Sequence, residues 1–138
     1  MTPDSDAGSG YVGLVVVSHH RLIAEGTAEL AGQMAGPEVR IVPAGGMADG
    51  AIGTDAVRIA EAIGAADAGA GVVVVADLGS AVLSTVTALE LLGDPGGVRL
   101  SKGPIVEGAV MAAVQASTGS SLDEVLAAAE AAASLPKG

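Results

Sequence analysis

Two histidines, the only two in the chain, directly follow its first apolar run. The run Val12–Val17 leads into Ser18-His19-His20, and a second run, Val72–Ala76, leads into Asp77-Leu78-Gly79-Ser80. A carboxylate that holds one nitrogen of an imidazole fixes its tautomer and leaves the other nitrogen free as a nucleophile or base. Free N–H groups at the start of a helix suit a phosphate. If the two run ends meet, they predict phosphoryl transfer through histidine, or general-base catalysis.

Both runs lack the alternation of a half-exposed strand, which is typical of central strands in a parallel sheet. Helical apolar spacing follows each run, so strands and helices alternate along the chain. The predicted fold is α/β, a three-layer αβα sandwich with a mainly parallel sheet of about four strands in the order 2-1-3-4. This order makes strands one and three neighbours, with His19 and Asp77 at their carboxyl ends. The expected strands are 12–17, 39–42, 72–76 and 98–100, and the expected helices are 20–35, 54–63, 80–92 and the stretches that begin at 104 and 121.

Helix starts are marked by capping residues. Thr54 and Ser80 are expected N-caps, and Ser121 with Glu124 has the spacing of a capping box. Pro104 is expected to be the first residue of its helix. The side chains of that helix expected to face inward are Val106, Val110, Ala113 and Val114.

Each feature of the predicted site also has a purely structural interpretation. A histidine at a strand end is often a polar loop residue, and Asp-x-Gly-Ser is often a turn followed by a helix cap. Ser18 could cap the first helix, which is the commoner role, or donate to a phosphoryl oxygen. Thr54 could line the site in addition to capping a helix. Together, at one edge of the sheet, these features favour a functional site.

Length and composition bound the possibilities. The 138 residues predict a single domain, 11–138, behind a flexible N-terminal tail, 1–10. A net charge of −10 argues against nucleic acid or an anionic membrane as a partner. The start of the chain lacks the basic region of a signal peptide, and no apolar stretch is long enough to span a bilayer. A cytoplasmic protein is therefore expected.

Several motif classes are excluded. Gly8-x-Gly10-x-x-Gly13 matches the dinucleotide fingerprint by letter, but it precedes the first strand instead of following it. The chain contains no Walker A and no Gly-x-Ser-x-Gly sequence. It has no cysteine, and two adjacent histidines alone make a poor metal site. No cofactor and no metal are therefore expected.

Five segments resemble one known family. They are Val-Val-Ser-His-His-Arg at 16–21, Gly-Thr-Asp at 53–55, Asp-Leu-Gly-Ser-Ala at 77–81, Thr-Ala-Leu-Glu-Leu-Leu at 87–92 and Pro-Ile-Val-Glu-Gly at 104–108. In this order they look like DhaM, the phosphotransferase subunit of PTS-dependent dihydroxyacetone kinase. The leading domain of that family is similar to the mannose-type EIIA domain of the sugar phosphotransferase system. The resemblance runs from Val12 to Ala133.

The resemblance implies a phosphohistidine relay between proteins. Phospho-HPr, charged from phosphoenolpyruvate by enzyme I, would pass its phosphoryl group to His19. The group would then go to ADP bound on the DhaL subunit, while dihydroxyacetone is held on DhaK. Family members are homodimers, so a homodimer is expected.

The same resemblance assigns roles to residues. Asp77 matches the partner that orients the imidazole. His20 stands where a small polar residue is common, and we expect it to be a bystander. The groups expected to stabilise the phosphoryl group are Ser18, Gly79 and Ser80.

Three other functions stay open. The chain could be a mannose-type EIIA domain that passes phosphate to an EIIB partner. Phosphorylation of His19 could instead change only what the surface binds, as in a regulatory module. A small hydrolase that uses His19 and Asp77 as a base lacks an obvious nucleophile and is the least favoured. The sequence leaves open which ring nitrogen is phosphorylated.

Overall fold

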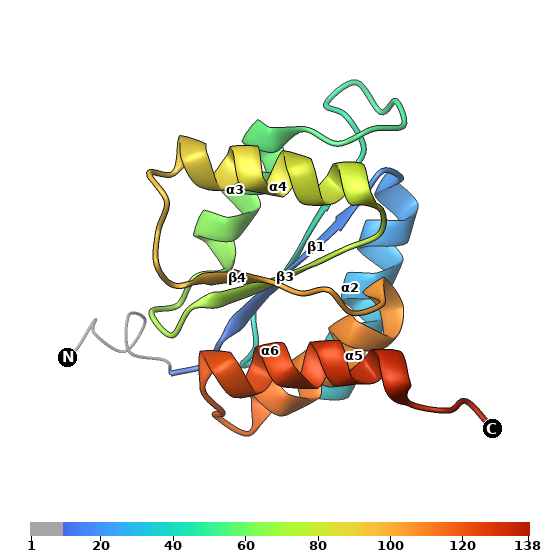
Figure 1. Cartoon of the computed structure of the whole chain (residues 1–138), viewed down its shortest axis with the longest axis vertical. Coiled ribbons are helices and arrows are strands. Elements are labelled where there is room, and N and C mark those ends of the chain that lie inside the picture. Colours follow the sequence, from blue (N-terminus) through green and yellow to red (C-terminus); the bar gives the residue numbers. More distant parts are fainter. Residues whose placement is uncertain (1–9) are drawn as a thin grey trace.

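One parallel sheet forms the centre of the computed structural model, which describes residues 10–138 (Figure 1). In the described residues it has four strands in the order β2-β1-β3-β4, which confirms the predicted order. The expected flexible tail, 1–10, lies outside the described residues except for Gly10. The elements are β1 (Gly13–Ser18), α2 (Arg21–Ala35), β2 (Ile41–Gly45), α3 (Ala56–Ala66), β3 (Val72–Ala76), α4 (Gly79–Leu91), β4 (Val98–Leu100), α5 (Ile105–Ser117), α6 (Leu122–Ala131) and the 3-10 turn η1 (Ala132–Ser134).

Helices cover both faces of the sheet and so make three layers (Figure 1). Helices α2, α5 and α6 pack on one face, and α3 and α4 pack on the other. Along β1, Leu14 and Val16 point into the first core, whereas Val15 and Val17 point into the second. Because both faces are buried, the strand needs an apolar residue at every position, which explains its unbroken apolar run. None of the described helices is long and apolar enough to cross a membrane.

The second strand lies further along the chain than predicted. It covers Ile41–Gly45 instead of 39–42, and Pro43 lies inside it, opposite Val16 of β1. β1 bonds to the carbonyl of Arg40 and the N–H of Gly46, so the backbone groups of Pro43 point to the free edge. A proline there costs no bond between strands, and it blocks the addition of another strand. Pro43 therefore protects the edge instead of ending the strand.

The helices bury their small residues and expose many large ones. On α5, Ala113 is buried as predicted, but Val106 and Val114 are exposed, so that part of the prediction is wrong. Close packing explains the difference, because a Cβ on Gly108 of α5 would lie only 3.2 Å from the carbonyl oxygen of Ala129 on α6. Only small residues fit between elements this close. On α2 the buried residues are Ala24, Thr27, Ala28 and Ala31, and the large exposed ones are Leu22, Ile23, Leu30 and Met34.

Gly45 brings the end of β2 against the start of α2, next to the predicted site. A Cβ at this position would lie 2.7 Å from Ala24 Cβ and 2.8 Å from Arg21 Cα. We expect Gly45→Ala to lower the free energy of unfolding by about 1–3 kcal/mol, because the start of α2 must shift. Urea unfolding measures this loss. Gly26→Ala is the matched control, since nothing lies within 4 Å of a Cβ there, and it should stabilise α2 by about 0.5–1 kcal/mol. Equal stability of Gly45→Ala and the wild type would contradict the packing argument.

Candidate functional site

His19 and Asp77 lie side by side at the carboxyl ends of β1 and β3. His19 directly follows β1, and Asp77 directly follows β3. The N–H of Asp77 donates to the carbonyl of Val17 at 3.2 Å, which continues the pairing of the two strands. Nδ1 of His19 lies 3.0 Å from Oδ1 of Asp77. The strand order thus joins the two residues that the sequence paired.

Asp77 accepts hydrogen bonds on both carboxylate oxygens. Oδ2 accepts the hydroxyl of Ser18 at 2.9 Å and the N–H of His19 at 3.0 Å. Oδ1 accepts the N–H of Leu78 at 2.8 Å beside its contact with the ring. Burial acts to raise the pKa of Asp77, but the hydrogen bonds from His19 and Ser18 and the nearby imidazole lower it more, so the net pKa lies below its ordinary value. Asp77 is therefore ionised, and Nδ1 of His19 carries the proton that it donates.

The other ring nitrogen of His19 faces the first turn of α4. Nε2 lies 2.5 Å from Oγ of Ser80, and 21% of the His19 side chain is exposed. With Nδ1 protonated, Nε2 carries a lone pair, which accepts the proton of the Ser80 hydroxyl. In this tautomer Nε2 is the ring nitrogen that can act as a nucleophile or base.

The start of α4 offers N–H groups beside that nitrogen. Leu78 is the N-cap of α4 and makes no side-chain cap hydrogen bond, so the prediction that Ser80 caps this helix is wrong. Gly79 and Ser80 are instead the first residues of the helix, and both are exposed. The first N–H groups of a helix have no acceptor within it and favour an anion. A phosphoryl group on Nε2 would lie near this anion-binding end.

The helix α2 is capped by the second histidine. Nδ1 of His20 accepts the N–H of Leu22 at 3.1 Å, so His20 has a structural role. Ser18 does not cap α2. Its side chain is completely buried, and its Oγ accepts the N–H of His20 at 3.1 Å while donating to Asp77.

Thr54 connects the loop between β2 and α3 to α4 and does not cap α3. The N-cap of α3 is Asp55, which accepts the N–H groups of Val57 and Arg58, so the predicted cap is off by one residue. The Thr54 hydroxyl lies 2.6 Å from the Ser84 hydroxyl on α4. The N–H of Gly53 donates to the carbonyl of His19, and the N–H of Gly46 donates to the carbonyl of Ser18, so the loop between them is fixed at both ends to the end of β1. Ser84 is not among the residues expected at the site, and only its spacing one turn after Ser80 points to it in the sequence.

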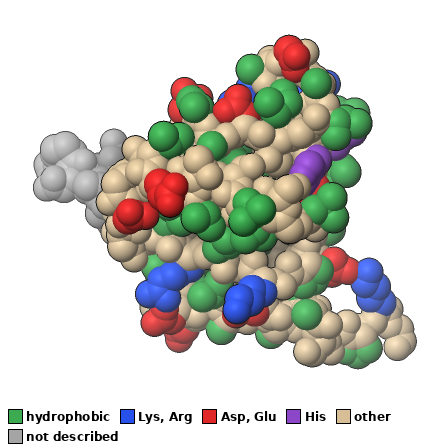
Figure 2. Space-filling view, turned by 45° about the horizontal axis from the view of Figure 1, so that its top comes forward, with side chains coloured by type: hydrophobic (Ala, Val, Ile, Leu, Met, Phe, Trp, Pro, Cys, Tyr) green, Lys and Arg blue, Asp and Glu red, His purple; other side chains and the backbone are tan. Residues whose placement is uncertain are grey.

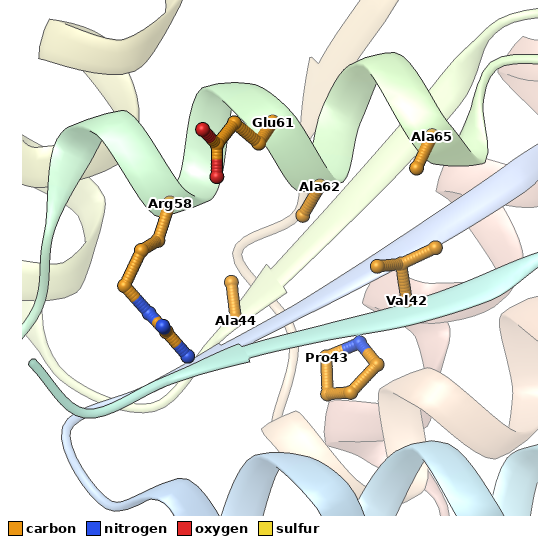
Figure 3. A pocket seen from close by; sticks show the side chains of 7 residues that line it. All are labelled: Val42, Pro43, Ala44, Arg58, Glu61, Ala62 and Ala65. Carbon is orange, nitrogen blue, oxygen red and sulfur yellow. The ribbon is translucent and has the colours of Figure 1, made fainter. Parts of the chain in front are cut away.

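The space at His19 is small. A hollow of about 50 Å³ is lined by His19, His20, Arg21, Gly50, Ala51 and Ile52. A larger hollow of about 290 Å³ lies between β2 and α3, where the side chain of Arg58 reaches from α3 toward the sheet (Figure 3). None of the residues lining the larger hollow belongs to the His19 site. No group of three or more His, Cys, Asp or Glu side chains that could hold a metal ion occurs among residues 10–138.

The lowered pKa of Asp77 makes stability depend on pH. A carboxylate whose pKa is lower in the folded than in the unfolded state stabilises the fold above its unfolded pKa and loses this effect as the pH falls through the folded value. The free energy of unfolding should therefore be higher for the wild type than for Asp77→Asn at neutral pH, and the difference should shrink below about pH 4. Urea unfolding across this pH range measures it. A difference that stays constant down to about pH 2 would contradict the ionised state of Asp77.

Comparison with known proteins places this geometry in a family. Residues 13–126 match the family described as PTS system fructose IIA component, known as EIIA-man. The chain belongs to this family. The match runs from the first residue of β1 into α6, so it includes the whole sheet together with His19 and Asp77. The mannose-type EIIA-like fold predicted from the sequence is thereby confirmed.

Curated relatives of this EIIA-man chain share one name. A protein of Listeria innocua, 38% identical over 117 residues, is named PEP-dependent dihydroxyacetone kinase 2, phosphoryl donor subunit DhaM, and the match covers 83% of this chain and 94% of that protein. Subunits with the same role in Providencia stuartii and Escherichia coli are 43% and 44% identical, again over 83% of this chain. The EIIA-man chain spans only 25% of the length of these two relatives.

Solved structures show the same fold. The crystal structure of EF1359, a protein of unknown function, is 35% identical, with a TM-score of 0.77 and coverage of 87% of this chain and 93% of that one. A sigma-54 interaction domain protein from Enterococcus faecalis has a TM-score of 0.65 at 16% identity, covering 87% of this chain and 88% of that one. The second likeness concerns the fold alone.

Proposed function

We propose that this EIIA-man chain is the phosphoryl donor subunit of a dihydroxyacetone kinase and that Nε2 of His19 carries the phosphoryl group. The observation that carries the proposal is the position of the proton on the imidazole ring of His19. Ionised Asp77 holds Nδ1, and this leaves the lone pair of Nε2 at the surface beside the start of α4. The curated relatives named DhaM support the same role.

The proposed relay has two steps at one nitrogen. In the first, Nε2 of His19 attacks the phosphorus of phospho-HPr, and the bond from phosphorus to the donor nitrogen breaks as the new bond forms. The ring keeps its Nδ1 proton, and the Asp77 carboxylate balances its positive charge. In the second step, an oxygen of ADP bound on DhaL attacks the phosphorus, and the bond to Nε2 breaks. The ATP formed on DhaL then phosphorylates dihydroxyacetone held on DhaK.

The surface around His19 suits a protein partner better than a small substrate. Pockets for small molecules usually hold about 300–1,000 Å³, whereas the hollow at His19 holds about 50 Å³. Hydrophobic side chains border the histidines at the surface (Figure 2). Exposed apolar patches of this kind mark contact sites between proteins. The four large apolar residues on the segments nearest His19, each more than half exposed, are Leu22, Ile52, Leu78 and Leu83.

The proposed relay is cytoplasmic, and its partners are phospho-HPr as donor and DhaL–ADP as acceptor, with DhaK downstream. As the family resemblance implies, the working form is a homodimer. The relay needs no cofactor or metal in this chain.

A reconstituted transfer assay tests the proposal. Incubation with phosphoenolpyruvate, enzyme I and HPr should produce an acid-labile phosphohistidine on this chain. Addition of DhaL–ADP should then remove the phosphoryl group, and addition of DhaK should yield dihydroxyacetone phosphate. Absence of labelling under these conditions would overturn the proposal.

The same assay separates the main alternatives. A mannose-type EIIA domain would lose its phosphoryl group to an EIIB protein and not to DhaL–ADP. A regulatory module would be labelled on His19 but would fail to support the phosphorylation of dihydroxyacetone. Mixing the labelled chain with each acceptor in turn distinguishes the three functions.

A further inference from the structure

Ser18 is a serine at the buried end of the central strand β1. Its side chain is completely buried, and it lies between the first turn of α2 and the carboxylate of Asp77. The partner of its hydroxyl is 59 residues away in the chain. A phosphoryl group on the exposed nitrogen of His19 cannot reach a hydroxyl that is completely buried and bonded on both sides. Ser18 therefore needs an explanation other than phosphoryl binding.

Only one assignment of donors and acceptors satisfies the hydrogen bonds around Asp77. The N–H of His20 can only donate, so Oγ of Ser18 accepts there and directs its own proton to Oδ2 of Asp77. Oδ2 also receives the N–H of His19, which leaves Oδ1 for Leu78 and the ring. With three donors already fixed, the carboxylate is ionised and turned so that Oδ1 meets Nδ1 of His19. The ring must then donate from Nδ1.

We propose that Ser18 is a positioning residue that fixes the rotation of the Asp77 carboxylate and, through it, the tautomer of His19. Without the Ser18 hydroxyl, Oδ2 keeps a single donor and the carboxylate turns more freely. In part of the molecules His19 then carries its proton on Nε2. These molecules cannot attack phosphorus, because a protonated Nε2 has no lone pair. The kinetic part of this inference depends on the proposed function, but the tautomer does not.

Few other charges act on Asp77. His19 is the only titratable side chain that contacts it in the part of the chain that the structure describes. The first residues of α4 add none, and on α2 the next charged group, Arg21, is paired with Glu25. A change in the behaviour of Asp77 after mutation of Ser18 therefore reports on the hydroxyl itself.

Ser101 provides a matched control. It is also a buried serine at the end of a parallel strand, and its Oγ accepts the N–H of Gly103, two residues on, as Ser18 accepts the N–H of His20. Ser101 makes no hydrogen bond to Asp77. Ser101→Ala thus removes the same local hydrogen bond without touching the carboxylate.

NMR spectra of the ring nitrogens test the inference without any partner protein. The wild type, Ser18→Thr and Ser101→Ala should show the Nδ1–H tautomer of His19, and Ser18→Ala should show a mixture. Ser18→Cys, which fills the space with a weaker donor, should be intermediate. If Ser18→Ala does not fold, Ser18→Cys decides the question. A wild-type tautomer in Ser18→Ala, or in Ser18→Cys if only that variant folds, would overturn the inference.

The transfer assay adds a second measurement. Ser18→Ala should accept the phosphoryl group from phospho-HPr about 10-fold more slowly, and Ser18→Thr should restore the rate. The acid limb of the pH–rate profile should move to higher pH in Ser18→Ala, because Asp77 loses a hydrogen bond that lowers its pKa. An unmoved acid limb would contradict the positioning role. If no variant and no wild type is phosphorylated, the proposed function fails, while the tautomer still decides the role of Ser18.

Discussion

Replacement of His19 by alanine is expected to abolish phosphorylation of this chain by phospho-HPr. Ionised Asp77 holds the proton of His19 on Nδ1, and the lone pair of Nε2 meets only the rotatable hydroxyl of Ser80, so no neighbouring group can replace Nε2 as nucleophile. Transfer from the chain to DhaL–ADP should be lost with it. Radiolabel from phosphoenolpyruvate, followed by acid treatment, measures both steps. The fold should persist, since His19 lies at the surface and caps no helix.

His20→Ala is the control for this experiment. It should still be labelled, because the Nδ1 of His20 is engaged with the N–H of Leu22 at the start of α2. Loss of this cap should lower the free energy of unfolding by about 0.5–2 kcal/mol. Label that survives in His19→Ala but disappears in His20→Ala would reverse the assignment of the two histidines.

Asp77→Asn should slow phosphorylation by about 10²–10⁴-fold without removing the nucleophile. The amide oxygen of asparagine can accept the N–H of His19 and the hydroxyl of Ser18, which turns the NH₂ group toward the ring. Nδ1 of His19 must then accept, and the proton moves to Nε2. The nucleophilic lone pair disappears, and the positive ring of the phosphorylated state loses its counter-charge. Initial rates of labelling, together with NMR of the ring nitrogens, measure both effects.

Asp55→Asn provides a comparison at the same edge of the sheet. Asp55 caps α3 through backbone N–H groups only, and asparagine caps a helix about as well as aspartate. This variant should keep the wild-type rate within about twofold, since its charge contacts no reacting group. A similar loss of rate in both variants would mean that the general loss of negative charge matters, and not the contact between Asp77 and His19.

Most of the fold follows from local patterns in the sequence. The unbroken apolar runs of β1 and β3 predict central strands, because only a strand buried on both faces requires apolar residues at every position. The alternation with helices predicts a doubly wound sheet, and the order 2-1-3-4 expected for it brings His19 next to Asp77, as observed. The capping box of Ser121 and Glu124 is also present as predicted. These features depend on neighbours in the chain or on simple topology.

Which face of each helix is buried, and where β2 begins and ends, could be learned only from the tertiary structure. Helical spacing fits both the alanine face and the leucine face of α2, and only the short distance between layers decides that the alanines are buried. Pro43 looks like the end of a strand until its place at the free edge is known. The pattern of residues in one sequence does not show how close two layers pack or which strand lies at the edge of the sheet.

The sequence by itself predicted that His19 and Asp77 lie together, because their place at the ends of neighbouring strands follows from the expected topology. Only the tertiary structure decided how the surrounding hydroxyls are used. Ser18 turns inward to Asp77, Ser80 meets Nε2, and Thr54 joins Ser84, although all four carry the same kind of hydroxyl. The physical reason is that a hydroxyl can donate or accept in many directions, so its role depends on which groups folding brings within about 3 Å of it.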